Sequence, residues 1–271
     1  MITMKTESMM KTTRFYRPYG WKAKIGLIVP STNTINEPEF YRLAPSGISV
    51  HTARVLNTGP ATQEAYDRMA QGVMEAADLI KTAEVDIVAY GCTSGSVFCS
   101  LSDLITGMKE RVGVPAIATA GAVIAALRAV GSRNIALGTP YIDFVNAGEV
   151  EFLEEHGFTV SSVQGLDLGH TYEEKQDIGR VPPQALFQLA RAIDTPEADA
   201  IFISCTNLAT LDMISCIETE LGKPVITSNQ ATFWACLRML GLRDSISGYG
   251  ALLERCLEPV DETSFALEPA T

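Results

Sequence analysis

VDIVAYGCT (residues 85–93) and ADAIFISCT (residues 198–206) follow the same plan, an apolar run that ends in a cysteine and a threonine. A short apolar run bounded by turn-forming residues is typical of a strand buried in a parallel sheet. Cys92 and Cys205 then each stand at the carboxyl end of a strand, where open α/β sheets bind their ligands. Either the similarity is a coincidence, or the two stretches are the two halves of one site.

Three further pairs of similar segments occur in the same order, which favours duplication over coincidence. Their offsets are 109 or 110 residues, and the two cysteine segments lie 113 residues apart. A repeated period is the sequence signature of related structural units. We predict a first half at 22–131 and a second half at 132–245, with a flexible leader at 1–21 and a tail at 246–271 that packs back on the first half. The further pairs are KIGLIVP (24–30) with NIALGTP (134–140), GVPAI (113–117) with GKPVI (222–226), and ALRAVG (126–131) with CLRMLG (236–241).

Strand-like runs alternate with helical patterns of apolar residues, which indicates parallel βαβ units. The prediction is therefore an α/β fold of two pseudo-symmetric halves with parallel sheets. Packing of the halves about a pseudo-twofold axis would bring both thiols into one cleft, where we expect the active site. In the first half we expect strands at 24–30, 85–90 and 116–118, and helices at 65–83, 101–112 and 120–130.

Composition excludes several classes of function. A net charge of −11 argues against a nucleic-acid surface. No apolar run approaches the roughly 18–20 residues of a membrane span, and the N-terminus lacks the apolar stretch of a secretory signal. The six cysteines include no CxxC pair and no cysteine–histidine pair with zinc-finger spacing. We expect a cytoplasmic protein with reduced thiols, no structural metal, and neither nucleic acid nor membrane as a partner.

The residues after each cysteine suit the binding of a small carboxylic acid. Thr93, Ser94, Thr206 and Asn207 supply capping side chains and N–H groups that can hold a carboxylate and lower the pKa of a thiol. Two thiols on opposite faces of the acid could move a proton on and off carbon, or one thiol could add to carbon. The alternatives are that the cysteines are buried structural residues, or that the cleft belongs to a non-catalytic binding module. For the cysteines at 99, 216, 236 and 256 we expect core packing.

Polar loops follow the first strand of each half and flank the same cleft. Asn33, after VPST, and Tyr141, after GTP, are placed to donate hydrogen bonds to substrate oxygens. Simple turn chemistry is the alternative. We interpret the neighbouring Glu37 and Glu39 as solvated or helix-capping carboxylates.

Several ordered motifs resemble the aspartate/glutamate racemase superfamily, in its maleate cis–trans isomerase and arylmalonate decarboxylase branch. The resemblance covers roughly residues 22–250 and implies two Rossmann-like halves with the substrate between them. Superfamily habit also implies a homo-oligomer and no metal or organic cofactor. The motifs are GLIVPSTNTINEPEF (26–40), YGCTSGS (90–96), GTPYIDFVN (138–146), SCTNLATLD (204–212) and SGYG (247–250).

The resemblance also implies roles for individual residues. Racemases of the superfamily use two cysteines as acid and base, whereas arylmalonate decarboxylases have glycine in place of the first, so a chain with both Cys92 and Cys205 resembles the isomerases more. The expected reaction is conversion of maleate or a close analogue to the trans acid, with Cys92 adding to C2 and Cys205 handling the proton. Amino-acid racemisation and malonate-type decarboxylation are the alternatives.

For substrate binding, the resemblance assigns carboxylate contacts to Asn33 and Tyr141, and an oxyanion pocket to Thr93 and Ser94. The isomerases carry a further asparagine before the second cysteine strand. Here the corresponding segment, LDLGHTYEEKQDIGRVPP (166–183), has none. The polar candidates for that place are Lys175, Gln176, His170 and Arg180.

Overall fold

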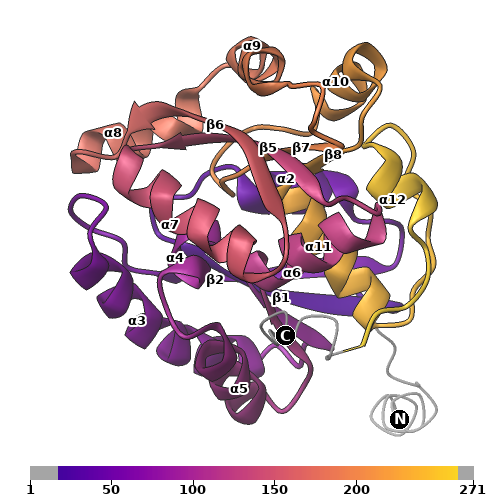
Figure 1. The fold of residues 1–271 in the computed structure, drawn as a ribbon. Helices are drawn as coiled ribbons and strands as arrows, with labels where there is room; N and C mark the ends of the chain where they lie inside the picture. The colour runs from indigo at the N-terminus through magenta and orange to yellow at the C-terminus, as the bar shows by residue number, and fades with distance from the viewer. Residues whose placement is uncertain (1–17, 262–271) are drawn as a thin grey trace, which may run out of the picture.

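The computed structural model describes residues 18–261 as two parallel sheets with helices around and between them (Figure 1). The first half consists of β1 (Ala23–Pro30), α2 (Asn36–Leu43), β2 (Ile48–Val55), α3 (Gln63–Lys81), β3 (Ile87–Tyr90), α4 (Thr93–Val97), α5 (Leu101–Val112), β4 (Ala116–Ala118) and α6 (Thr119–Ala129). The second half consists of β5 (Asn134–Tyr141), α7 (Asp143–Glu155), β6 (Thr159–Leu168), α8 (Tyr172–Asp177), the 3₁₀ turn η1 (Ile178–Arg180), α9 (Pro183–Ile193), β7 (Ala200–Ile203), α10 (Ile214–Leu221), β8 (Val225–Thr227) and α11 (Ser228–Met239). The helix α12 (Ala251–Arg255) follows.

The two sheets have the same topology, which confirms the predicted α/β fold. The strand orders are β2-β1-β3-β4 and β6-β5-β7-β8, and every pairing is parallel. The register is also repeated, because Ile25 pairs with Ile87 in the first sheet and Ile135 pairs with Ala200 in the second. Ile25 and Ile135 lie 110 residues apart and Ile87 and Ala200 lie 113 apart, which are the offsets between the repeated sequence segments. The duplication is therefore structural.

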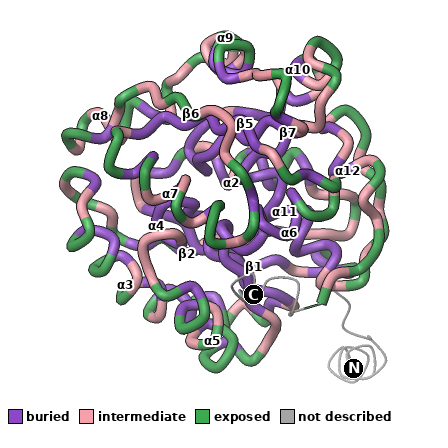
Figure 2. The backbone as a smooth tube through the Cα atoms, viewed as in Figure 1, coloured by how far each residue is buried: buried purple, intermediate pink, exposed green. Residues whose placement is uncertain are grey.

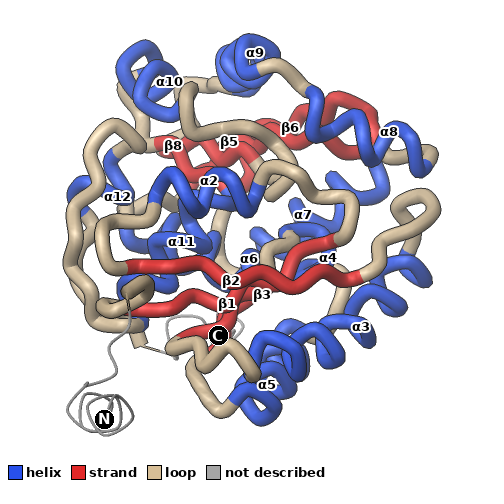
Figure 3. Tube along the Cα trace, turned by 180° about the vertical axis from the view of Figure 1, so that it is seen from behind, coloured by secondary structure: helices blue, strands red, loops and turns tan. Residues whose placement is uncertain are grey.

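Two helices lie between the sheets and are buried almost all round. Every residue from Thr119 to Leu127 in α6 is buried, as is every residue from Ser228 to Arg238 in α11. The two helices pack against each other at the centre of the molecule, and Figure 2 shows them among the buried segments. The small and apolar residues of α6 are typical of such a position, whereas α11 also buries polar side chains that make hydrogen bonds, among them Asn229, Gln230 and Arg238. In contrast, α3, α5, α9 and α10 cover the outer faces of the sheets (Figure 3).

The sequence did not indicate β2 and β6, the edge strands beside β1 and β5. β2 (ISVHTARV) contains a histidine and an arginine, and β6 (TVSSVQGLDL) has no buried residue. β2 and β6 are edge strands that carry polar residues and therefore lack the continuous apolar signal, whereas the other two edge strands, β4 and β8, are short and fully buried. The expectation that four cysteines fill the core was also wrong in part. Cys236 is buried, but Cys216 is exposed and Cys99 and Cys256 are half-buried.

Only part of each chain end is described in the structure. Most of the predicted leader, 1–17, and the end of the tail, 262–271, lie outside the described residues. The described part of the tail contacts both halves: α12 packs on α11 and β8 of the second half, and Cys256 Sγ donates to the Ala129 carbonyl of the first half at 3.5 Å. Trp234 and Arg238 of α11 also donate hydrogen bonds to the Cys256 carbonyl. Within 18–261 no helix combines the length and the apolar character needed to cross a membrane.

Candidate active site

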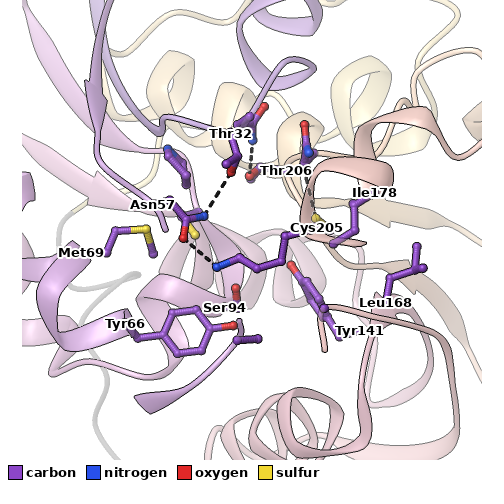
Figure 4. Close-up of a pocket in the computed structure, with 17 residues that line it drawn as sticks. Thr32, Asn57, Tyr66, Met69, Ser94, Tyr141, Leu168, Ile178, Cys205 and Thr206 are labelled. Atoms are coloured by element: carbon purple, nitrogen blue, oxygen red, sulfur yellow. Dashed lines mark hydrogen bonds between the residues drawn. The ribbon is translucent and has the colours of Figure 1, made fainter. Parts of the chain in front are cut away.

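A pocket with about 520 Å³ of empty space lies between the carboxyl ends of the two sheets. Figure 4 shows Asn57, Tyr66 and Met69 on one side of it, and Tyr141, Leu168 and Ile178 on the other. The two sides come from the two halves of the chain. Seven of the eight predicted site residues line the pocket, namely Asn33, Cys92, Ser94, Tyr141, Cys205, Thr206 and Asn207.

Cys92 caps the N-terminus of α4. Its backbone is extended, with φ of −152°, and Sγ accepts a hydrogen bond from the Gly95 N–H at 3.3 Å. Burial raises the pKa of Cys92, and the Gly95 N–H and the hydroxyls of Tyr90 and Ser94 oppose that rise. The positive charge of Lys175 also favours the thiolate. The thiol is buried, but its anion has four stabilising groups around it.

Cys205 has a different backbone conformation and different hydrogen-bond partners. Its φ is +113°, in the region that favours glycine, so the position carries backbone strain. Sγ accepts from the Asn207 N–H at 3.3 Å, and the Cys205 N–H donates to Ser228 Oγ at 3.0 Å. Burial raises the pKa of Cys205 to about 12, although the Tyr141 hydroxyl and the Asn207 N–H oppose the rise. At neutral pH this thiol therefore holds its proton and can serve as an acid.

Hydrogen bonds between the halves fix the loops that carry these residues. The Asn33 side-chain amide donates to Thr206 Oγ1 at 2.9 Å, and that hydroxyl donates to the Gly91 carbonyl at 3.0 Å. The Thr34 N–H donates to Asn207 Oδ1 at 2.9 Å. Each cysteine loop is thus held against the opposite half.

Thr93 is the predicted site residue that does not line the pocket. Its hydroxyl donates to Ser228 Oγ at 2.8 Å, and the same oxygen accepts from the Cys205 N–H. The α4 helix turns this side chain inward, toward α11. Thr93 therefore supports the Cys205 loop from behind.

The sequence reasoning missed several residues of the pocket wall. Asn57 follows β2, and its position at the carboxyl end of a strand would have indicated it if that strand had been recognised. Tyr66 and Met69 lie on α3, where a helical apolar stripe reads as core. Of the candidates named in 166–183, Lys175 lines the pocket, whereas His170 and Arg180 are exposed and pair with Asp167 and Asp177.

Two buried carboxyl groups lie near the site. Glu39 was expected to be solvated or capping, but its Oε1 accepts hydrogen bonds from the Thr210 and Leu211 N–H groups, at 2.7 and 3.0 Å, and its Oε2 from the Asn229 amide. Glu149, which the sequence did not indicate, accepts from the Ser204 hydroxyl at 2.9 Å. Burial raises the pKa of Glu149 to about 8. Glu39 joins the halves, and Glu149 lies behind Cys205.

The family model for arylmalonate decarboxylase matches residues 25–253, which span both halves and the whole pocket. The chain belongs to the arylmalonate decarboxylase family. This is a family of enzymes, and its fold is the one described above. Within 18–261 no three His, Cys, Asp or Glu side chains gather so as to hold a metal ion.

Individual relatives within this family carry two different activities. An arylmalonate decarboxylase from Bordetella bronchiseptica is 32% identical over 236 residues, covering 85% of this chain and 96% of the relative. A maleate isomerase from Geobacillus stearothermophilus is 27% identical over 248 residues, with 85% and 96% covered. A maleate isomerase from Pseudomonas putida S16, solved with maleate, superimposes with a TM-score of 0.79 at 26% identity, covering 85% of this chain and 97% of that one. This chain is thus homologous to both kinds of enzyme.

Proposed function

We propose that this chain is a cofactor-independent cis–trans isomerase of a small unsaturated carboxylic acid, maleate or a close analogue. The observation that carries the proposal is the presence of two thiols, Cys92 and Cys205, in one pocket but in different surroundings. Four groups around Cys92 favour its anion although burial raises its pKa, and the pKa of Cys205, about 12, keeps that thiol protonated at neutral pH. A nucleophile and an acid are the two groups that reversible addition to a double bond needs.

The proposed reaction is balanced by the two cysteines alone. The Cys92 thiolate forms a bond to C2, and the electron pair of the C2=C3 bond moves to C3 and its carboxylate. Cys205 gives its proton to C3, which leaves a single bond that can rotate. The Cys205 thiolate then removes a proton from C3, the double bond forms again, and the bond from C2 to Cys92 breaks. The trans acid leaves and both thiols return to their first state.

The polar wall of the pocket is suited to the substrate carboxylate. We assign the contacts to the Asn33 amide, the hydroxyls of Ser94 and Tyr141, and the 206–207 loop. Hydrogen bonds from these groups would strengthen as negative charge grows on the carboxylate during addition. Because they are already fixed across the two halves, little reorganisation accompanies the reaction.

The first experiment is to incubate the protein with maleate and follow fumarate by proton NMR. We expect fumarate from the wild type and from Cys216→Ala, which alters an exposed thiol outside the pocket. Cys92→Ala and Cys205→Ser should each lose activity by at least about a thousandfold, in line with the loss of a catalytic group. Absence of fumarate in the wild-type reaction would refute maleate isomerisation.

A second candidate is decarboxylation or racemisation of a small acid at carbon. The protonated Cys205 thiol supports this second candidate, because the thiol could protonate a carbanion-like intermediate. The 32% sequence identity to the arylmalonate decarboxylase from Bordetella bronchiseptica supports it as well. Incubation with malonate-type acids in deuterated water tests it. Deuterium incorporation that depends on Cys205, without any isomerisation of maleate, would favour this candidate.

A further inference from the structure

Lys175 is the only charged residue among the seventeen that line the pocket. It projects from α8 of the second half toward the first half. Its Nζ donates to Asn57 Oδ1 at 2.7 Å and to the Gly59 carbonyl at 3.1 Å. An ammonium group has three N–H donors, so these two bonds leave one donor for the pocket.

The orientation of this ammonium is set by the first half. The Asn57 amide donates to Thr32 Oγ1 at 3.1 Å, which turns its carbonyl oxygen toward Lys175, and the Asn57 N–H donates to Ser31 Oγ at 3.0 Å. Close by, the Ala61 N–H donates to the Gly169 carbonyl at 3.1 Å and joins the same two loops. A lysine side chain is otherwise flexible, so these contacts hold its charge at one end of the pocket.

The Lys175 ammonium has no carboxylate partner in the described part of the chain, although its charge also favours the Cys92 thiolate. Both acceptors of Lys175 are neutral, and none of the ion pairs between described residues includes it. The chain as a whole carries a net charge of −11, so carboxylates are abundant elsewhere. A half-buried cation that has a free N–H donor and no carboxylate partner, beside a pocket, is suited to bind an anionic ligand group.

From this geometry we infer that Lys175 is a specificity-determining residue that selects substrates with a second carboxylate. This inference rests on the proposed function and deepens it. One carboxylate lies at the wall formed by Asn33, Tyr141 and the 206–207 loop, and the second accepts the free N–H of Lys175. The pocket therefore favours dicarboxylates over acids whose distal end is a neutral amide, because an amide leaves the ammonium uncompensated.

Binding of non-reacting ligands tests the inference separately from catalysis. Succinate has no double bond, and succinamate replaces one of its carboxylates by an amide of the same shape. By isothermal titration calorimetry we expect the wild type to bind succinate about 10- to 100-fold more tightly than succinamate, as expected for one charge-assisted hydrogen bond. Lys175→Gln should abolish the preference while leaving the affinity for succinamate nearly unchanged, because an intact pocket still binds the first carboxylate.

The control is Lys24→Gln. Lys24 is also half-buried and donates to a backbone carbonyl, that of Ala83, but it does not line the pocket. This variant should keep the wild-type preference. The inference is overturned if Lys175→Gln still prefers succinate, or if the wild type binds both ligands alike or binds neither. A succinate preference that depends on Lys175, in a protein without maleate turnover, would support the inference and reject only the proposed reaction.

Discussion

The two thiols of the pocket occupy equivalent places in a duplicated fold, yet their surroundings differ. Cys92 has an ordinary extended backbone at φ −152°, whereas Cys205 is held at +113°. Holding a non-glycine residue in that region costs on the order of 1–3 kcal/mol, which the surrounding structure must compensate. The Cys205 N–H bond to Ser228 and the Asn207 N–H bond to Sγ fix this conformation. The duplication thus supplies two thiols, and local contacts give each its own backbone conformation and hydrogen-bond partners.

Glu149 gives a prediction about stability and pH. Its side chain is 2% exposed, and only one of its two oxygens has a hydrogen-bond partner. Its pKa in the folded protein, about 8, lies above the ordinary value of 4.5, so the folded state binds the proton more tightly than the unfolded state. Stability that Glu149 contributes at low pH is therefore lost as pH rises from about 4.5 to 8, by on the order of 3–5 kcal/mol.

Chemical denaturation at pH 6 and pH 9 checks this prediction. Glu149→Gln keeps an oxygen that accepts from Ser204 but does not titrate, so its free energy of unfolding should fall less between the two pH values than that of the wild type. Glu151→Gln, on the exposed side of the same helix, should behave like the wild type. Parallel loss in wild type and Glu149→Gln would contradict the assignment.

At the scale of elements, the short helix α4 fixes Cys92 through a glycine. A Cβ at Gly95 would lie 2.5 Å from the Tyr90 hydroxyl oxygen, 2.7 Å from Met69 Cε and 2.8 Å from Cys92 Sγ. Gly95→Ala must therefore displace the thiol or the N–H that donates to it. We expect at least about a tenfold loss of kcat with maleate, because small misplacement of a catalytic group is costly.

Gly107→Ala in α5 is the matched control for that variant. There a new Cβ would meet only the flexible end of Met74, at 2.9 Å from Sδ and 3.0 Å from Cε. Alanine is a better helix former than glycine by up to about 1 kcal/mol, so this variant should keep its activity and its thermal stability. If Gly95→Ala retained wild-type kcat, the argument that Gly95 positions Cys92 would be wrong.

The elements also show what the sequence could predict. β3 was predictable because burial on both faces of a strand requires continuous apolar residues. The amphipathic helix α5 and the short buried strand β4 also lie at the predicted residues. The repeat placed Cys92 and Cys205 in one cleft because equivalent strands end at equivalent edges. Asn57 and Glu149 were not predicted, because Asn57 depends on the unrecognised edge strand β2 and Glu149 on a contact between α7 and Ser204, which follows β7. Contacts between segments far apart in the chain produce no periodic pattern of apolar residues in the sequence.

At the scale of the whole molecule, a polar network holds the halves together beside the pocket. Glu39 on α2 accepts hydrogen bonds from the second half, and the Asn229 amide that donates to it also donates to the Thr206 carbonyl, at 3.1 Å. Burial raises the pKa of Glu39, and these hydrogen bonds oppose the rise. The segment after Cys205 is therefore positioned by a carboxylate of the opposite half. We therefore expect the active site to assemble as the halves dock.

This coupling predicts that Glu39→Gln loses stability and activity together. The amide group of glutamine would point an N–H donor at other donors and leave one of them unpaired, which costs about 2–4 kcal/mol in a buried site. Urea denaturation should show one transition at a lower midpoint than the wild type, and kcat with maleate should fall at concentrations where the variant is still folded. Glu37→Gln on the same helix breaks only a partly exposed pair with Arg54 and should change stability by less than about 1 kcal/mol. Two separate transitions, or full activity in folded Glu39→Gln, would show that the halves fold and position the cysteines independently.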